Sequence, residues 1–434
     1  MSIYDDWGFS DNPFQTTALP PTQLGCSLLI GRDIELQQLQ RRLTNPPKLP
    51  TLEGLNGVGK SSLVNVAAFN CYSSFLSDSN QPMLIPCRKV FQLRPDLELQ
   101  DFIDDVLREV AQTLIEEAKN IKNRDVSCNT GSTRLDRWLN SPQLTSYQGG
   151  VWVLSAGRTT ETNTGEGFTR SGFRKSVVNW LAELFPTPRD GGVVCTIDNL
   201  ELLQTSEAAR RQLEVLRDEL LTLRGLRWVL CGALGIVLGV VSSPRLEGLL
   251  HTPVSVTGVD DQYVDDIFES RLSAFAISDP YLPITAHDFR RLYGILAKNL
   301  RSLLGHADDY CQWIVGRGRP EADEEKSDTF HRWLTEMSEQ ALLAAQSQLR
   351  PRAWEVFDDG VGRGGTFSPS DYEEFGFNSI PAFRPAVRDL ESAGLLVSTQ
   401  DEGDKRRKTI QVTPKGWLVN YARRQQSNSD AEVP

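Results

Sequence analysis

The residues most able to do chemistry lie in one glycine-rich run. Residues 54–62 read Gly-Leu-Asn-Gly-Val-Gly-Lys-Ser-Ser, which fits the GxxxxGKS pattern, with an apolar stretch before the run and a helical pattern after it. In such a loop the glycines let backbone N–H groups surround phosphate oxygens, while Lys60 adds positive charge and the Ser61 hydroxyl can ligate Mg²⁺. We therefore expect the chain to bind a nucleoside triphosphate with Mg²⁺. The expected contacts are Gly54, Asn56, Gly57, Val58, Gly59, Lys60, Ser61 and Ser62.

A second candidate is the carboxylate of Asp198. Residues 192–198 read Gly-Val-Val-Cys-Thr-Ile-Asp, the pattern of a buried strand that ends in an acidic residue. In phosphate-loop ATPases a carboxylate in this place reaches the Mg²⁺ shell. Ligands of open α/β sheets bind at the carboxyl ends of the strands, so we expect Asp198 and Ser61 to hold the metal together.

Strands and helices that alternate along the chain would position these residues. Strand patterns at 83–91, 192–198 and 228–231 are separated by amphipathic helix patterns at 97–118, 171–185 and 208–223. The alternation predicts an α/β fold, a P-loop NTPase with a parallel sheet, over residues 1–252. Residues 1–30 are expected to lie extended over this domain. Residues 120–170 are rich in Asn, Thr, Gly and Ser, and predict an insertion with a hairpin near 150–154.

Beyond residue 252 the pattern changes twice. Helix patterns at 260–275, 287–313 and 328–349 predict a helical lid domain over 253–338. Residues 339–425 then follow the order helix, helix, helix and hairpin, which predicts a winged-helix domain. We expect a disordered tail over 426–434.

The composition limits the class of protein. Of the 434 residues 39% are hydrophobic and 24% charged, as in soluble globular proteins, and the net charge of −11 argues against a protein that coats nucleic acid over its whole surface. Seven cysteines, never closer than sixteen residues apart, and four histidines offer no zinc-ligand spacing. With an acidic N-terminus and no apolar run beyond the fourteen residues 228–241, we expect a cytoplasmic protein without a membrane segment.

With these parts in order, the chain resembles the AAA+ ATPases, and among them the origin-recognition and replication-initiator branch. That branch joins an AAA+ base, a helical lid and a C-terminal winged helix, and the resemblance covers most of residues 10–425. The glycine-rich run matches the Walker A motif, and residues 193–198 match the Walker B motif. Asn12-Pro-Phe and residues 29–36 look like the segment that packs on adenine, which implies ATP as the nucleotide and gives a binding role to Ile30, Gly31 and Arg32.

The lid carries two further parts of the resemblance. Residues 259–272 are similar to the helix that follows the sensor strand, and residues 297–304 resemble the sensor-2 helix, whose arginine reaches the γ-phosphate. The resemblance gives that role to Arg301. The alternative is a surface arginine on an amphipathic helix.

The residues expected to carry out hydrolysis depart from the family pattern. Asn199 stands where the family has a glutamate that polarises the attacking water, and an amide can orient water but cannot take its proton. Glu201 could replace that glutamate or lie on the loop surface. Cys231 occupies the place of the polar sensor-1 residue, and Arg245 is either an arginine finger in trans or a surface arginine. These departures imply slow hydrolysis and a nucleotide-controlled switch rather than a motor.

The ligand of the predicted winged helix stays open between DNA and protein. The candidate DNA contacts are Arg384 and Arg388 on its third helix and Lys405, Arg406, Arg407 and Lys408 in its wing. Residues 350–424 contain twelve basic and eleven acidic residues, so the domain as a whole is nearly neutral.

The expected function is that of an ATP-dependent regulator. It would form homo-oligomers through ATP sites at subunit boundaries and engage DNA in replication, transposition or defence against mobile elements and phages. The alternative is a STAND-like signalling ATPase whose winged helix docks a separately encoded protein effector. Neither reading involves a membrane.

Overall fold

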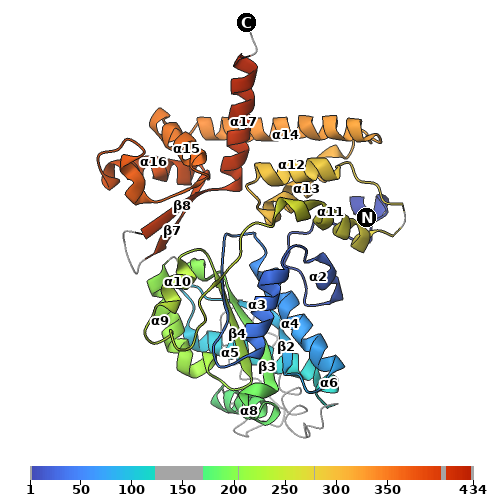
Figure 1. Cartoon of the computed structure of the whole chain (residues 1–434), viewed down its shortest axis with the longest axis vertical. Helices are drawn as coiled ribbons and strands as arrows, with labels where there is room; N and C mark the ends of the chain where they lie inside the picture. Colours follow the sequence, from blue (N-terminus) through green and yellow to red (C-terminus); the bar gives the residue numbers. More distant parts are fainter. Residues whose placement is uncertain (1, 123–169, 204, 278, 402–406, 432–434) are drawn as a thin grey trace, which may run out of the picture.

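The computed structural model describes residues 2–122, 170–203, 205–277, 279–401 and 407–431. Figure 1 shows an α/β base, with a helical lid and a C-terminal domain on the same side of it. The insertion predicted at 120–170 lies almost entirely outside the described residues, and so does its predicted hairpin.

In the described part of the chain, the base is built on a five-stranded parallel sheet. Its strands lie in the order β2-β3-β4-β1-β5. They are β1 (Thr51–Glu53), β2 (Met83–Gln92), β3 (Gly191–Asp198), β4 (Leu226–Gly232) and β5 (Val254–Ser255). Because all of them run in one direction, the loop after β1 and the last residue of β3 reach the same edge of the sheet. The predicted α/β P-loop NTPase fold is confirmed.

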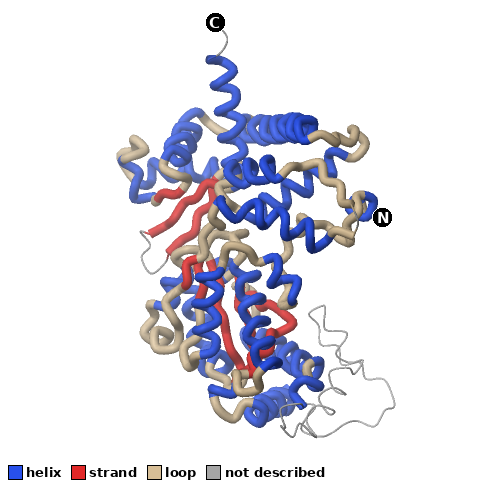
Figure 2. The backbone as a smooth tube through the Cα atoms, turned by 45° about the vertical axis from the view of Figure 1, so that its right-hand side comes forward, coloured by secondary structure: helices blue, strands red, loops and turns tan. Residues whose placement is uncertain are grey.

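Both faces of the sheet are covered, as the tube in Figure 2 shows. β3 is buried along its whole length, which explains its continuous apolar sequence. Val193, Cys195 and Ile197 of β3 join the larger core, and Val194 joins a smaller core on the other face. The helices of the base are α3 (Asp33–Thr44), α4 (Lys60–Ser77), α5 (Leu99–Glu116), α6 (Ala118–Lys122), α8 (Arg170–Leu184), α9 (Ser206–Leu216) and α10 (Ile236–Val241).

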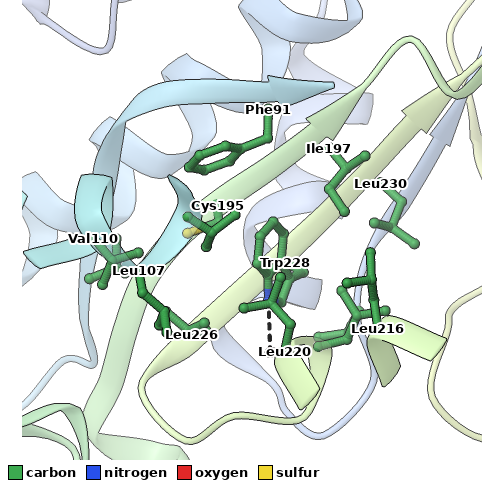
Figure 3. Packing of buried hydrophobic residues seen from close by; sticks show 14 of the residues in the cluster. Phe91, Leu107, Val110, Cys195, Ile197, Leu216, Leu220, Leu226, Trp228 and Leu230 are labelled. Atoms are coloured by element: carbon green, nitrogen blue, oxygen red, sulfur yellow. Dashed lines mark hydrogen bonds between the residues drawn. The ribbon is translucent and has the colours of Figure 1, made fainter. Parts of the chain in front are cut away.

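Trp228 of β4 lies at the centre of the larger core (Figure 3). Its indole N–H donates to the Leu220 carbonyl at 3.3 Å, so the only polar atom of the side chain is satisfied. Leu220 belongs to a π-helical turn, Arg217–Leu221, which ends α9 earlier than the helix predicted over 208–223.

The first residues of the chain pack in the lid rather than over the base. Tyr4, Phe9 and Phe14 are buried in the lid core, and the Tyr4 hydroxyl donates to Asp308 at 2.6 Å. The short helices α1 (Ile3–Asp6) and α2 (Gln23–Leu28) lie on either side of an extended segment that crosses from lid to base. The domain boundary predicted for residues 1–252 is therefore wrong at its beginning.

The lid consists of α11 (Val264–Phe275), α12 (Ala286–Ile295), α13 (Leu300–Ile314) and the first part of α14 (Asp323–Gln346). One continuous helix was predicted over 287–313, and this is wrong: α12 and α13 are separate. Between them Ala297 and Lys298 have φ values of 51° and 63°, in the left-handed region, which no α-helix can contain.

The C-terminal domain follows the predicted order in part: the second predicted helix is a 3₁₀ turn, a short strand precedes it, and a long helix follows the hairpin. It contains α15 (Pro351–Gly362), β6 (Thr366–Phe367), a 3₁₀ turn (Pro369–Glu373), α16 (Ile380–Ser392), β7 (Leu396–Asp401), β8 (Arg407–Val412) and α17 (Pro414–Ala431). The strands form an antiparallel sheet, β6-β8-β7. Because α17 continues to Ala431, residues 426–431 are helical and not the disordered tail that we predicted.

Two long helices join the lid to the C-terminal domain. α14 contributes Phe330 and Trp333 to the lid core and Leu342 and Ala345 to the C-terminal core, so no linker separates the two domains. α17 packs against α14 and α12. Among the described residues, no helix has the length and apolar character needed to span a bilayer.

Candidate nucleotide-binding site

The phosphate-binding loop connects β1 to α4 as predicted. Gly57 and Gly59 have φ values of 86° and 99°, a conformation that glycine adopts without strain, so the backbone requires glycine at these two positions. Lys60 is 5% exposed, and its ammonium donates to the Gly54 and Leu55 carbonyls at 2.9 and 3.0 Å. The loop therefore curves around a buried positive charge.

Ser61 and Asp198 meet at the edge of the sheet. The Ser61 hydroxyl donates to the Asp198 carboxylate, which is almost completely buried. Two oxygen ligands in contact suit Mg²⁺, which binds through one or two protein oxygens and completes its shell with phosphates and water. Within the described residues no cluster of three or more His, Cys, Asp or Glu offers another metal site.

Asn199 lies in the cavity wall directly after Asp198. Its φ of 56° is left-handed, and its N–H donates to the Asp198 carboxylate at 2.8 Å. Asparagine tolerates this conformation better than most residues, because its short polar side chain can hydrogen-bond locally. The backbone at this position therefore favours the amide residue over the longer glutamate of the family pattern.

Glu201 and Cys231 lie behind this wall and do not line the cavity. The Glu201 Oε2 accepts the Ala233 N–H at 3.0 Å, while its buried Oε1 has no hydrogen-bond partner among the described residues. Burial raises the pKa of the Cys231 thiol well above its usual value, and the charge of Asp198 raises it further. Cys231 is thus a neutral thiol, a weak hydrogen-bond donor.

An N-terminal strap, defined as residues 13–19, forms one wall of the cavity. Thr16, Thr17, Ala18 and Leu19 all line it. Ser62 and Asn65, at the start of α4, fix one end of the strap: the Leu19 N–H donates to the Ser62 hydroxyl at 3.0 Å, and the Asn65 amide donates to the Leu19 carbonyl at 2.8 Å.

Arg271 of the lid fixes the other end of the strap. Its guanidinium donates to the Pro13 and Gln15 carbonyls at 2.9 and 3.4 Å, and it is 4% exposed. Burial lowers the pKa of Arg271 to about 10, so the group stays charged at neutral pH. Its Nε lacks a hydrogen-bond partner within the described residues, and Arg271 itself lines the cavity. The strap therefore connects the lid to the base along one side of the cavity.

Another part of the cavity wall is apolar. It is lined by Leu28, Leu29, Ile30, Val259, Ile267, Leu300 and Leu304, a surface suited to the flat face of a nucleobase. Arg32 lies beside it, 5% exposed, and donates to the Val58 and Thr257 carbonyls at 2.9 and 2.5 Å while pairing with Glu35. Arg32 thus holds the phosphate loop to the segment that leads into the lid.

Arg301 is placed at the cavity by the first turn of α13. The side chain is exposed and lines the site, and its backbone N–H donates to the Gly57 carbonyl at 3.1 Å. Among the described residues its guanidinium forms no ion pair, which leaves the charge available to a bound phosphate.

Most of the predicted nucleotide contacts are brought together. Those that line one cavity are Ile30, Arg32, Asn56, Gly57, Val58, Gly59, Lys60, Ser61, Ser62, Asp198, Asn199 and Arg301. Gly54 supports the loop through its carbonyl, and Gly31 packs against Tyr263 and Val259. Arg245 lies elsewhere, half-exposed and 3.6 Å from Asp218.

The strap and Arg271 are the contacts that sequence reasoning missed. Asn12-Pro-Phe pointed to this segment, but nothing in the pattern marked Thr16 or Thr17 as cavity residues. Arg271 lies within residues 259–272, which resemble the helix after the sensor strand, but nothing in the sequence assigned it a role at the nucleotide.

The predicted DNA contacts are only partly described. Arg384 and Arg388 are exposed on α16, and neither forms an ion pair within the described residues. Lys405 and Arg406 lie outside the described residues. Arg407 and Lys408 begin β8, opposite Asp401 and Gln400 of β7.

The chain is similar to several solved structures. The ORC2 protein of Aeropyrum pernix, in ADPNP and ADP complexes, shares 11% identity over 98% of this chain and 100% of that chain, with a TM-score of 0.48. The ORC1 protein of the same organism in complex with DNA shares 14% identity over 92% of this chain and 95% of that chain, with a TM-score of 0.41. A Walker-type ATPase of Pyrococcus abyssi shares 15% identity over 95% of this chain and 99% of that chain, with a TM-score of 0.46.

No protein-family model matches the chain, and no curated protein is significantly similar to it. The solved structures include the origin-recognition proteins that the motifs resemble. The α/β phosphate-loop fold itself is established by the sheet order and the geometry of the loop.

Proposed function

We propose that this chain is an ATP-binding regulatory switch that hydrolyses ATP slowly. The observation that carries the proposal is the meeting, in one cavity, of a complete phosphate-binding loop with Asn199 at the place of a general base. The first part provides affinity for a triphosphate. Asn199 lacks the carboxylate that would take a proton from the attacking water.

Each residue has a distinct part in binding. Lys60 would move from the loop carbonyls to the β- and γ-phosphates, and the glycine backbone would donate its N–H groups to them. Ser61 and Asp198 would hold Mg²⁺, which neutralises phosphate charge when it is bound. Arg301 would contact the γ-phosphate from the lid, so the triphosphate and the diphosphate would hold the lid with different strength.

The test compares binding with turnover in the full chain. We expect a fluorescent ATP analogue to bind with micromolar or tighter affinity in the presence of Mg²⁺, and phosphate release to stay below about 0.1 per second, far under the usual enzyme rate of about ten per second. Rapid steady-state hydrolysis at or above the usual rate would contradict the switch. Absence of ATP binding would contradict the function altogether.

Oligomerisation would bring a second copy to the nucleotide. Arg245 is 55% exposed and its pair with Asp218, itself 64% exposed, is a weak surface pair that it can leave. As an arginine finger it would reach the γ-phosphate held by a neighbouring copy. Light scattering with and without ATP tests this, and Arg245→Ala should leave the ATP affinity of the monomer unchanged while it weakens ATP-dependent assembly.

The C-terminal domain, read as a winged helix, would engage double-stranded DNA. Arg384 and Arg388 lie one helical turn apart on α16, the third helix, and both are exposed. The same surface could dock a protein effector, as in signalling ATPases of the STAND type. Salt dependence separates the two readings, because phosphate contacts release counterions.

For DNA, affinity measured by anisotropy on a duplex should fall steeply with salt. Replacing Arg384 and Arg388 by alanine should lower the slope of log affinity against log salt by about two. Arg424→Ala, an exposed arginine on α17, is the matched control and should change the slope little. A binding signal that does not depend on salt, or none at all, would favour the protein effector.

A further inference from the structure

The connection between α12 and α13 is strained. Residues 296–299, which we call the lid latch, contain two consecutive left-handed residues, Ala297 and Lys298. Neither is glycine or asparagine, and a left-handed conformation is costly for side chains of this kind. Strain of this kind persists only where surrounding contacts determine the conformation, and it gathers at sites that bind or switch.

The surrounding contacts are present. The Lys298 N–H donates to the Tyr293 carbonyl at 3.0 Å, and the Lys298 ammonium pairs with Asp261 at 2.7 Å. The segment also passes so close to Gly258 that a Cβ at that glycine would lie 2.6 Å from the Lys298 Cβ. The latch is thus held from the α12 side and from the segment that joins base to lid.

Asn299 is the residue that this conformation delivers to the phosphate loop. Its Oδ1 accepts the Ser302 N–H at 3.0 Å and so caps α13. Its Nδ2 donates to the Asn56 carbonyl at 2.7 Å. Both partners fix the orientation of the amide, because only the oxygen can accept from Ser302 and only the nitrogen can donate to Asn56.

Asn299 also determines how closely lid and loop approach. A Cβ on Gly57 would lie 2.5 Å from the Asn299 Oδ1, so only glycine fits there. The Arg301 N–H donates to the Gly57 carbonyl beside it. Two consecutive peptide carbonyls of the phosphate loop are therefore held by the first turn of α13.

We propose that Asn299 is a positioning residue that locks the lid onto the phosphate loop and slows the release of bound nucleotide. The proposal rests on the proposed function, because it needs a nucleotide in the cavity. ATP or ADP enclosed between loop, strap and lid leaves only when the lid moves. Opening requires the Asn56 and Gly57 bonds to break, whereas the contacts of Lys298 with Tyr293, Asp261 and Gly258 do not involve the phosphate loop.

The first test is Asn299→Ser in the full chain. Serine is an equally good cap for α13 but is too short to reach the Asn56 carbonyl, so it removes the loop bond and keeps the helix. We expect the dissociation rate of a fluorescent ATP analogue to rise about three- to tenfold, as the loss of one hydrogen bond implies. Thr285→Ser, a conservative change at the cap of α12, is the control and should leave the rate unchanged.

The second test uses the neighbouring residue, which does not contact the phosphate loop. Lys298→Gly relieves the left-handed strain, so it should raise the melting temperature and leave the dissociation rate within about twofold of the wild type. Lys298→Ala keeps the Cβ and removes only the exposed pair with Asp261, so it should resemble the wild type. If Lys298→Gly or Lys298→Ala raised the dissociation rate as much as Asn299→Ser does, the specific role of Asn299 would be wrong.

The outcomes separate this proposal from the proposed function. If the wild type binds no nucleotide, the function fails. If it binds, but Asn299→Ser releases the analogue at the wild-type rate, the latch role is wrong and the function stands. Should Asn299→Ser fold poorly in thermal melting, Asn299→Asp keeps the size and the cap, and unchanged release in that variant would equally overturn the proposal.

Discussion

Two halves of one cavity are equipped very differently. On the phosphate-loop side, Lys60 is buried among loop carbonyls, Ser61 contacts Asp198, and the lid adds Arg301. On the side formed by the ends of β3 and β4, the corresponding places hold Asn199 and Cys231. The first side presents charge to phosphates, and the second presents the Asn199 amide, while the neutral Cys231 thiol does not line the cavity.

The difference indicates that binding and turnover are separable in this fold. Phosphate affinity comes from backbone N–H groups, one ammonium and one metal site, and none of these needs a general base. Turnover needs a proton acceptor near the attacking water, and general bases contribute about a hundred- to ten-thousandfold to rates. Four substitutions test whether binding and turnover are separable in this chain.

The largest effect is expected from Lys60→Ala. The change removes the Lys60 ammonium from the cavity wall and leaves the Gly54 and Leu55 carbonyls without their donor. Hydrogen bonds to charged groups contribute about 1.5–3 kcal/mol, and the Lys60 ammonium would bond to two phosphates. ATP affinity should therefore fall roughly a hundredfold. Isothermal titration measures it. Lys89→Ala, an exposed lysine of β2 paired with Asp105, is the control, and equal losses in both variants would contradict the role of Lys60.

The next largest effect concerns the other half of the cavity. Asn199→Glu should raise kcat for ATP at least about tenfold, because a general base outweighs the roughly 1 kcal/mol that a left-handed glutamate costs in stability. The thermal midpoint should drop by a few degrees. Asn199→Gly is the matched variant: it suits the backbone, supplies no base, and should leave turnover slow. If Asn199→Glu stays as slow as the wild type, the missing carboxylate is not what limits hydrolysis.

The phosphate side of this comparison could be predicted from the sequence, because its chemistry is local. The glycines, Lys60 and Ser61 belong to one contiguous loop, and Asp198 follows from the burial of a parallel strand. The prediction of Arg301 as a site residue came from the family resemblance, and the structure places Arg301 at the cavity.

The remaining contacts come from tertiary structure that no local pattern encodes. Ala297 and Lys298 are good helix formers, so the pattern over 287–313 predicts one helix. Packing against Gly258 and the phosphate loop overrides that propensity. Likewise, Arg271 lies more than two hundred and fifty residues from the strap that it holds, so only the folded chain brings them together.

A moderate effect is expected from Arg271→Met, which releases the lid end of the strap. Methionine has a similar length and fills the space, and removing a buried charge offsets the loss of two hydrogen bonds, so stability should change by no more than about 1 kcal/mol. ATP affinity should fall about three- to tenfold, because the wall formed by Thr16 and Thr17 loses its anchor. Titration of ATP and a thermal melt of the unliganded chain distinguish the two quantities. A large drop in stability with unchanged affinity would mean that Arg271 supports the lid only.

The smallest effect is expected from Glu201→Gln. This variant tests whether Glu201 acts as the general base on the side of the cavity formed by the ends of β3 and β4. Glu201 accepts the Ala233 N–H and lies outside the cavity wall, so glutamine should keep that bond and alter kcat by less than about twofold. Glu201→Ala also removes the hydrogen bond from the Ala233 N–H. The resulting drop in melting temperature measures how much that bond contributes to stability. If Glu201→Gln lowers kcat at least tenfold while the melting temperature stays constant, Glu201 reaches the water during the reaction. The two halves of the cavity would then both be equipped for chemistry, and the slow switch would need another cause.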